Sequence, residues 1–238
     1  MKTILHPAST RGIANFGWLD ARYSFSFANF YDPNRLQFGA LRVLNDDIIA
    51  PSMGFGEHPH KNMEIITIPQ SGILKHKDSM GNEGIVKAGD IQVMSAGSGI
   101  EHSEINAKDN EELSLFQLWI FSNEQNVTPR YDQKKIQPLL KTNRLTAIVK
   151  PRDKALDGEV WIHQDAYIHL GNFNKKTTTT FSLNSKAHGA YVYIINGNAE
   201  INNIKLNKRD AMGIWDVDLI EISVEKDSDL MLIEVPMN

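Results

Sequence analysis

Cysteine is absent from this sequence of 238 residues. The chain therefore has no disulfide bond, no zinc or iron–sulfur site with thiolate ligands, and no thiol nucleophile. Any metal site must use histidine, aspartate or glutamate side chains as its ligands. Eight histidines are present, so imidazole ligands are available.

Long apolar runs are missing as well. A membrane-spanning helix needs about 20 apolar residues, whereas the run Ala190–Ile195 is only six residues long. The first residues, MKTILHPASTRG, lack the apolar stretch of about 7–15 residues that a signal peptide contains. We therefore expect no membrane span, and we assign the chain to the cytoplasm by default.

An excess of positive charge is the third feature that the sequence lacks. The 25 Lys and Arg residues against 29 Asp and Glu residues give a net charge of −4. This balance gives no indication of the basic face that direct nucleic-acid binding requires. Apolar residues make up 41% and charged residues 23%, which is typical of a globular protein with one large or two small domains.

Helix-period stretches are scarce, and short runs rich in β-branched and aromatic residues take their place. Turn signals such as Gly89-Asp90 and Asn196-Gly197 separate these runs. Many short strands with frequent turns are typical of a β-sandwich or β-barrel. We predict an all-β fold with strands at Ala40–Val43, Glu64–Ile68, Ile91–Met94, Leu113–Phe121, Ala190–Ile195, Ala211–Trp215, Leu219–Val224 and Leu230–Val235.

A weak internal repeat indicates two similar halves. One strand ends in a glycine turn at Gly72 and another at Gly197, and further turns follow at Asp90 and Asp210. The polar segment 122–138 between the halves contains two prolines and is typical of a connection between two packed bodies. We predict an N-terminal domain at 1–125, a linker at 126–139 and a C-terminal domain at 140–238.

Two glycine-flanked segments carry pairs of metal-ligand side chains. His58 and His60 form one pair, and His102 and Glu104 form the other. Residues i and i+2 of a strand point to the same face, so each pair can supply half of a chelating site. One His-x-His pair arises by chance in a sequence with this many histidines, but the second pair favours a metal site.

The chemistry of this donor set limits the metal. Three imidazoles with one carboxylate suit a first-row divalent metal, whereas Ca²⁺ and Mg²⁺ prefer oxygen ligands. Four protein ligands leave at least one open position on a five- or six-coordinate metal, which is typical of a catalytic site. We expect one divalent metal per chain, and the set accepts Fe, Ni, Mn, Cu, Co or Zn.

The same segments resemble the cupin motifs. His58-x-His60-x3-Glu64 followed by Gly72 is similar to the first motif, and Gly89…Gly99-x2-His102-x3-Asn106 is similar to the second. Further segments resemble the pirin family, most closely bacterial members described as quercetin 2,3-dioxygenases. These segments are Arg11-Gly, Gly17-Trp18-Leu19, Phe25-Ser-Phe-Ala-Asn-Phe-Tyr31-Asp32-Pro33, Leu41-Arg-Val-Leu-Asn-Asp46 and Ser95-Ala-Gly-Ser-Gly-Ile-Glu-His102-Ser-Glu104.

The resemblance covers most of residues 11–131 and implies two tandem cupin barrels, each a double-stranded β-helix. It also implies a resident metal, with iron as the family's expectation. General cupins take a glutamate ligand at the position of Glu64, whereas the pirin pattern places it at Glu104. We favour Glu104 as the fourth ligand and leave Glu64 beyond the ligands, orienting His60 or a water molecule.

The second half has no equivalent ligand set. Superimposing Gly197 on Gly72 places Leu183 and Ser185 at the positions of the first histidine pair. Superimposing Asp210 on Asp90 places Ile222 and Val224 at those of the second pair. We expect the C-terminal domain to be a degenerate cupin without metal that packs against or shapes the first domain.

The resemblance implies a metal-dependent dioxygenase that binds a flavonol such as quercetin, opens its ring with O2 and releases CO. The flavonol hydroxyl would lose its proton to a carboxylate, for which we favour Glu104, with Glu64 as the competing base. Two alternatives remain: a regulatory pirin that acts through a protein partner without turnover, and a cupin that only binds a small molecule. A monomer is the default expectation.

Several other residues have a simpler interpretation. We expect Phe25, Phe27, Phe30, Tyr31 and Phe38 to serve in packing rather than as a ligand pocket. Met53, Phe55 and Met94 are candidates for the lining of a pocket because they lie near the ligand segments. The isolated histidines, expected to be surface or hydrogen-bonded structural residues, are His6, His76, His163 and His169.

Overall fold

The computed structural model describes residues 1–156 and 159–237 of the chain. Within these residues the only helical element is one short 3₁₀ turn, Ala8–Thr10. The strands of the first half are β1 (Lys2–His6), β2 (Gly12–Asn15), β3 (Leu19–Tyr23), β4 (Leu41–Ile49), β5 (Gly54–His60), β6 (Met63–Ser71), β7 (Ile73–Asp78), β8 (Glu83–Lys87), β9 (Asp90–Ser95), β10 (Ile100–Asn106), β11 (Leu113–Phe121) and β12 (Arg130–Lys135).

The second half continues in the same manner. Its strands are β13 (Leu145–Pro151), β14 (Val160–Ile162), β15 (Tyr167–Phe173), β16 (Thr177–Ser182), β17 (His188–Asn196), β18 (Asn198–Ile201), β19 (Ile204–Asn207), β20 (Ala211–Trp215), β21 (Leu219–Val224) and β22 (Ser228–Pro236). The predicted all-β fold is confirmed, and strands are present at all eight predicted runs. In the described residues no helix has the length and hydropathy that crossing a bilayer requires.

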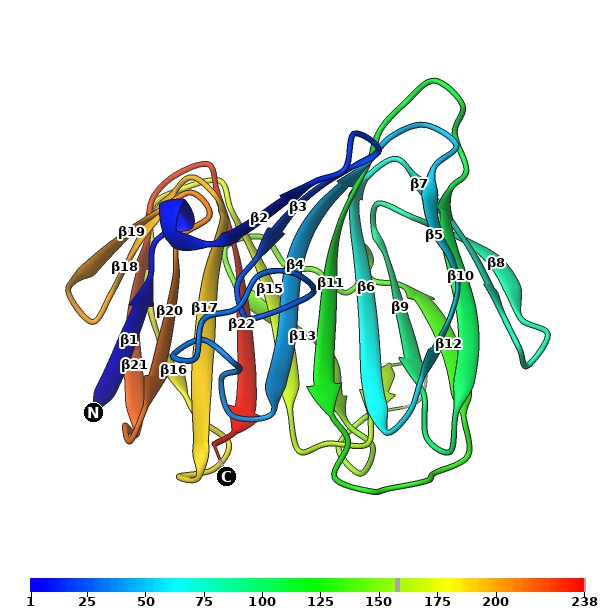
Figure 1. Ribbon diagram of the computed structural model, residues 1–238. Helices are drawn as coiled ribbons and strands as arrows, with labels where there is room; N and C mark the ends of the chain where they lie inside the picture. The colour runs from blue at the N-terminus through cyan, green and yellow to red at the C-terminus, as the bar shows by residue number, and fades with distance from the viewer. Residues whose placement is uncertain (157–158, 238) are drawn as a thin grey trace.

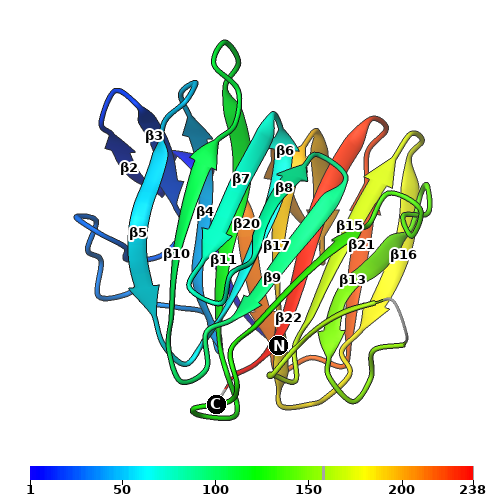
Figure 2. The same cartoon turned by 90° about the vertical axis from the view of Figure 1, so that its right-hand side faces the viewer.

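Each half forms one larger and one smaller sheet. The first half has the strand orders β12-β9-β6-β11-β4-β3-β2 and β5-β10-β7-β8 in the described residues. The second has β1-β20-β17-β22-β15-β13-β14 and β16-β21-β18-β19. The two barrels lie side by side, with the seven-stranded sheets toward each other and the four-stranded sheets outside (Figures 1 and 2). The predicted pair of tandem cupin barrels is thus confirmed.

The internal repeat extends through the central strands of both halves. The order β9-β6-β11-β4 in the first barrel corresponds to β20-β17-β22-β15 in the second. The small sheets correspond in the same way, with β5-β10-β7-β8 matching β16-β21-β18-β19. Because the strand orders match, positions in these strands of the first barrel can be compared with positions in the second.

Two edge strands do not follow the predicted division of the chain into domains and linker. β1 lies in the first half of the chain but pairs with β20 of the second barrel. Figure 1 shows it alongside β20. β12 lies within the predicted linker 126–139 and pairs with β9 of the first barrel. The division at 125 and 139 stays a prediction, and these strands show that the chain near it is part of the sheets.

Apolar side chains fill the space between the two large sheets. Phe25 and Phe38 pack against Tyr191, with ring centroids 5.3 and 5.5 Å away. All three belong to a buried cluster that also contains residues of β6, β11 and β22. Phe25 and Phe38 thus have the predicted packing role, whereas Tyr31 is 74% exposed.

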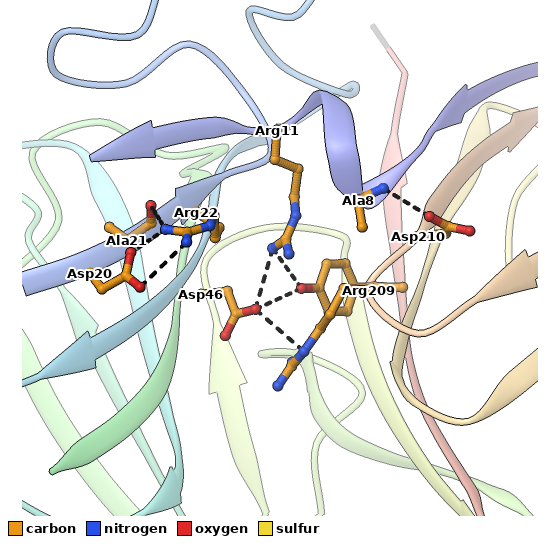
Figure 3. Close-up of polar contacts among 9 residues, drawn as sticks. Ala8, Arg11, Asp20, Ala21, Arg22, Asp46, Arg209 and Asp210 are labelled. Atoms are coloured by element: carbon orange, nitrogen blue, oxygen red, sulfur yellow. Dashed lines mark hydrogen bonds and ion pairs between the residues drawn. The ribbon is translucent and has the colours of Figure 1, made fainter. Parts of the chain in front are cut away.

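A polar cluster lies beside this apolar core and joins the barrels (Figure 3). The Asp46 carboxylate on β4 accepts hydrogen bonds from Arg11, 3.3 Å away, and from the Tyr193 hydroxyl of β17, 3.1 Å away. Arg209 of the second barrel forms an ion pair with the same oxygen at 3.5 Å. Because Arg11 is almost fully buried, this carboxylate is its necessary counter-charge.

Candidate metal centre

Antiparallel pairing of β5 and β10 brings the two ligand pairs together. In the register His102 lies opposite His58, and a bulge after His102 places Glu104 opposite Phe55. The close pairing requires glycine at position 54, since a Cβ there would meet the Glu104 carbonyl oxygen at 2.1 Å. The structure brings His58, His60 and His102 together, as the sequence predicted.

The three imidazoles form a compact triangle. Their ring centroids are 4.9 Å apart for His58 and His60, 4.4 Å for His58 and His102, and 4.9 Å for His60 and His102. One ring nitrogen of each lies within 4.8 Å of one from each of the other two. This arrangement leaves a position between the rings that a single ion can share.

Hydrogen bonding leaves these imidazoles available as ligands. His58 Nδ1 lies 2.8 Å from the Gly56 carbonyl oxygen, so Nδ1 carries the proton and Nε2 keeps a free lone pair. Both ring nitrogens of His102 are buried and lack a hydrogen-bond partner among the described residues. An unpartnered buried nitrogen is costly unless something binds it, so His102 fits a metal ligand.

Burial and mutual proximity favour the neutral form of His60 and His102. Burial lowers the pKa of His60 to about 4, with a further contribution from His58. Burial, His58 and His60 together lower the pKa of His102 to about 2. Because a metal binds the unprotonated ring, these shifts keep both lone pairs available at neutral pH.

Glu104 lies deeper in the barrel than the triangle. It is buried, and its carboxylate accepts hydrogen bonds from Thr67 Oγ1 at 3.1 Å and from Gln117 Nε2 at 2.8 Å. Burial raises its pKa to about 7, against the effect of these two hydrogen bonds. An oxygen of Glu104 groups within 4.8 Å with nitrogens of His102 and His76, which makes His102 the link between the carboxylate and the triangle.

His76 is a neighbour of the site that the sequence did not reveal. It is fully buried on β7, and its ring centroid lies 5.4 Å from that of His102. Its Nε2 lies 3.2 Å from Asp78, and its Nδ1 lies 3.3 Å from the amide of Gln92. With both nitrogens engaged, His76 has the hydrogen-bonded structural role predicted for it and is not a free ligand.

Glu64 faces away from the centre. Ser95 Oγ donates to its carboxylate at 2.7 Å, and its other oxygen lies 3.4 Å from Nδ1 of His163 in the second barrel. Burial raises its pKa to about 7. The expectation that Glu64 orients His60 or competes with Glu104 as the base is therefore wrong, because the Glu64 side chain contacts Ser95 and His163 instead.

The physical reason for this correction is a turn. Asn62 has a φ of 51°, so the strand alternation that relates residues 58 and 60 does not continue to residue 64. Within β6 the Thr67 side chain reaches Glu104, which places odd-numbered positions on the inner face of the barrel. Glu64 consequently belongs to the outer face, against the second barrel.

A cavity of about 270 Å³ opens onto the imidazole triangle. Five of its twelve lining residues are aliphatic or aromatic, and one of these, Trp119, packs against His60 with ring centroids 4.8 Å apart. Phe55 lines the cavity as predicted, and Phe27 also lines it, so the expectation that Phe27 serves only in packing is wrong. Met53 is 43% exposed, and Met94 is buried among other apolar side chains. The lining residues are Leu19, Tyr23, Phe27, Asn45, Asp47, Phe55, His58, His60, His102, Glu104, Gln117 and Trp119.

One row of polar side chains crosses the inner face of the large sheet. In the strand register Tyr23 lies beside Asn45, Asn45 beside Gln117, Gln117 beside Thr67, and Thr67 beside Gln92. Gln117 and Thr67 hydrogen-bond Glu104, and Gln92 hydrogen-bonds His76. This row supports the carboxylate, and its signal in the sequence is an isolated polar residue within an apolar run, such as Thr67 in β6 and Gln117 in β11.

The corresponding part of the second barrel is apolar. Ile222 and Val224 of β21 are fully buried in an aliphatic cluster that includes Ile201. In the register Ile222 lies opposite Thr179, so Thr179 takes the place of His58. The expected alignment of Leu183 and Ser185 with the first histidine pair is wrong, because both residues follow the end of β16.

Comparison with known sequences gives matches to both halves of the chain. The family model described as Pirin matches residues 7–120, and that described as Quercetinase C-terminal cupin domain matches residues 148–235. The protein named quercetin 2,3-dioxygenase of Escherichia coli K12 is 41% identical over 232 residues, covering 98% of each chain. A pirin-like protein of Caulobacter vibrioides is 39% identical over 228 residues, covering 96% of this chain and 97% of its own.

Solved structures agree with these matches. The crystal structure of the bacterial pirin YhhW from E. coli in complex with nickel(II) has a TM-score of 0.92 and 39% identity. The comparison covers all of both chains. A second E. coli YhhW crystal structure has a TM-score of 0.93 and 40% identity, covering 100% of this chain and 99% of that one.

Proposed function

The chain belongs to the pirin family, and we propose that it is a metal-dependent dioxygenase that cleaves a flavonol such as quercetin with O2 and releases CO. The observation that carries the proposal is the triangle of imidazoles that lines a cavity together with several aromatic side chains. Relatives named quercetin 2,3-dioxygenase, similar over nearly the whole chain, support the substrate class.

The donor set fits one divalent metal. His58, His60 and His102 would hold it through ring nitrogens, and Glu104, which groups with His102 but not with His58 or His60, would be the fourth ligand. The unpartnered nitrogens of His102 support this assignment. A nickel(II) complex of a relative agrees with a first-row metal, and three imidazoles with one carboxylate also accept iron, manganese, copper, cobalt or zinc.

The cavity would hold the substrate beside this set. Phe27, Phe55 and Trp119 offer flat apolar surfaces to an aromatic ring system. A flavonol presents a hydroxyl and a carbonyl oxygen on neighbouring carbons, a pair that suits a metal with open positions. The metal, when bound, would acidify that hydroxyl and supply the Lewis-acid chemistry of the reaction.

Glu104 would accept the proton of the flavonol hydroxyl. Burial raises the pKa of its carboxyl to about 7 in the metal-free protein, and a bound metal would favour the ionised form that can accept a proton. Gln117 and Thr67 hold the carboxylate in one orientation, which fixes the direction of the transfer. Loss of the proton leaves an electron-rich ring that O2 attacks, and ring opening expels one carbon as CO.

The experiment that tests this function measures gas exchange. Protein stripped of metal and reloaded with single metals is supplied with quercetin, and O2 consumption and CO release are followed together. We expect equal amounts of quercetin and O2 to be consumed and CO to be released, only in the metal-loaded protein. Metal binding without any turnover would contradict the proposal and favour a regulatory pirin that acts through a protein partner.

A further inference from the structure

Two polar side chains in the cavity have no role in holding the metal. Asn45 and Asp47 lie on β4, on the inner face of the large sheet, and each is only 3% exposed. The intervening Asp46 points the other way, into the cluster that joins the barrels. Strand alternation thus separates one structural carboxylate from two side chains that line the cavity.

Their side-chain oxygens lack partners. Oδ1 of Asn45 and Oδ1 of Asp47 are buried, and neither has a hydrogen-bond partner among the described residues. Buried polar atoms in folded proteins nearly always have a partner, so an unpaired one in a cavity indicates a group that awaits a ligand. Trp119 Nε1 is also unpaired, but it lies beside His60 at the metal end.

The strand register places this pair farther along β4 than the imidazole triangle. Trp119, which packs against His60, lies opposite Val43, and Asn45 and Asp47 follow two and four residues later. Asn45 lies across from Gln117, which donates to Glu104, so one strand spacing of about 5 Å separates Asn45 from the residue that holds the carboxylate. Asp47 lies two residues farther along β4, between apolar Ala21 and Leu115 in the register. A ligand anchored at the imidazoles therefore meets Asn45 and Asp47 with its distant part.

We propose that Asn45 and Asp47 form a polar subsite that binds hydroxyl groups on the part of an aromatic ligand remote from the metal. The proposal rests on the proposed function and narrows its substrate class to polyhydroxylated aromatic chelators. Both Oδ1 atoms accept hydrogen bonds, so phenolic O–H donors are the complementary groups. A ligand without these hydroxyls leaves both oxygens unpaired and binds less tightly.

Two flavonols separate this subsite from the metal end. Quercetin carries hydroxyls on its other rings, whereas 3-hydroxyflavone keeps only the metal-binding hydroxyl and carbonyl. Their dissociation constants are measured under nitrogen with nickel(II)-loaded wild type, Asn45→Leu and Asp47→Leu, and the melting temperature of each metal-free protein is recorded. Asn172→Leu on β15 of the second barrel is the control for a leucine introduced into a strand.

We expect the dissociation constant of quercetin to rise at least about tenfold in both cavity variants, and that of 3-hydroxyflavone to change less than about twofold. Because no described protein group pairs with these two oxygens, apolar replacements of similar shape leave the melting temperature unchanged or raise it. A purely structural role would lower it. If a leucine variant does not fold, Asn45→Ala and Asp47→Ala are compared on the same two ligands.

Equal weakening of both flavonols would overturn the subsite, since the two side chains would then only shape the cavity. Unchanged binding of both would overturn it as well and would mean that water satisfies the two oxygens. Failure of the wild type to bind either flavonol overturns the proposed function itself, and the subsite falls with it. The three results are distinguishable in one set of titrations.

Discussion

Opposing effects act on the pKa of the Glu104 carboxyl. Burial favours the neutral carboxyl, whereas the hydrogen bonds from Thr67 and Gln117 and a bound metal favour the carboxylate. Since its pKa in the folded metal-free chain is about 7 against an ordinary value of 4.5, ionisation above pH 4.5 is easier in the unfolded chain. Glu104 therefore destabilises the metal-free protein progressively as the pH rises from about 4.5 to 7.

Replacing Glu104 by Gln removes this cost. We expect metal-free Glu104→Gln to be more stable than wild type at pH 8, by up to about 3 kcal/mol, with no gain below about pH 4.5. The same variant should lose most of its metal, because the carboxylate is gone. Urea unfolding at several pH values and metal analysis check both effects, and a variant less stable than wild type at pH 8 contradicts the assignment.

Glu64 should behave differently although its pKa is raised to the same value. We expect Glu64→Gln to keep its full metal content, because the side chain faces Ser95 and His163 rather than the imidazoles. Elemental analysis measures the metal content of Glu64→Gln and Glu104→Gln side by side. The two variants carry the same substitution at two different buried carboxylates. Loss of metal from Glu64→Gln would show that the general cupin pattern, and not the pirin pattern, describes this site.

At the residue scale, spacing predicted the imidazoles but could not choose between the two glutamates, and the preference for Glu104 came from the resemblance to the pirin family. Spacing located His58, His60 and His102, because a two-residue repeat survives within a strand. It could not place Glu64, because the turn at Asn62 resets the alternation. Asn45 and Asp47 escaped notice for another reason, since polar residues inside a barrel resemble ordinary exposed strand residues until the sheet is known.

At the scale of elements, the placement of β5 decides the geometry of the metal centre. This strand carries two of the proposed ligands, yet most of its residues are exposed or half-buried, so its pairing with β10 holds it in place. Gly54 lies where a Cβ would meet backbone atoms of β10, whereas a Cβ at Gly56 would meet nothing within 4 Å. The two glycines of one strand thus form a natural comparison.

We expect Gly54→Ala to push β5 away from β10 and to weaken metal binding at least about tenfold, because the two histidines move away from His102. Gly56→Ala should leave the metal affinity within about twofold of wild type. Competition with a chelator measures both. Equal affinities in the two variants would mean that the pairing of β5 with β10 does not position the ligands.

Apolar strands were predictable, and polar strands were not. β6, β11 and β22 are buried on both faces between the barrels, so their sequences are nearly continuous apolar runs. β5 and β12 carry few apolar residues and exist because a neighbouring strand offers backbone hydrogen bonds. Propensity alone contains no signal for such strands.

At the scale of the whole molecule, the cluster around Asp46 connects the two barrels (Figure 3). We expect Asp46→Asn to lower the free energy of unfolding by about 3 kcal/mol, because it leaves the buried Arg11 without a full counter-charge. Asp20→Asn is the matched control, since the Asp20–Arg22 pair is partly exposed and contributes less than about 1 kcal/mol.

Urea unfolding of these two variants and wild type supplies the comparison. Metal content should be normal in both, because neither carboxylate lies among the proposed ligands. Equal stabilities would show that Asp46 does not hold the barrels together. Loss of metal from Asp46→Asn alone would instead reveal a coupling between the junction and the adjacent Asp47 in the cavity.

The tandem architecture was predictable from the repeat around Gly72 and Gly197, because both halves bury the same pattern of strands. The exchange of edge strands was not. β1 pairs with the second barrel through backbone groups, and no sequence pattern specifies which edge a short strand joins.

The central claim is that the imidazole triangle is the oxygenase centre, and one measurement tests it directly. Metal content and quercetin-dependent O2 uptake are determined on the same samples of wild type, His58→Ala, His102→Ala and His169→Ala, the last being a control in the second barrel. The account predicts about one first-row metal per chain and O2 uptake in wild type and His169→Ala, with both lost in the other variants. Undiminished metal content and O2 uptake in His58→Ala and His102→Ala would contradict it.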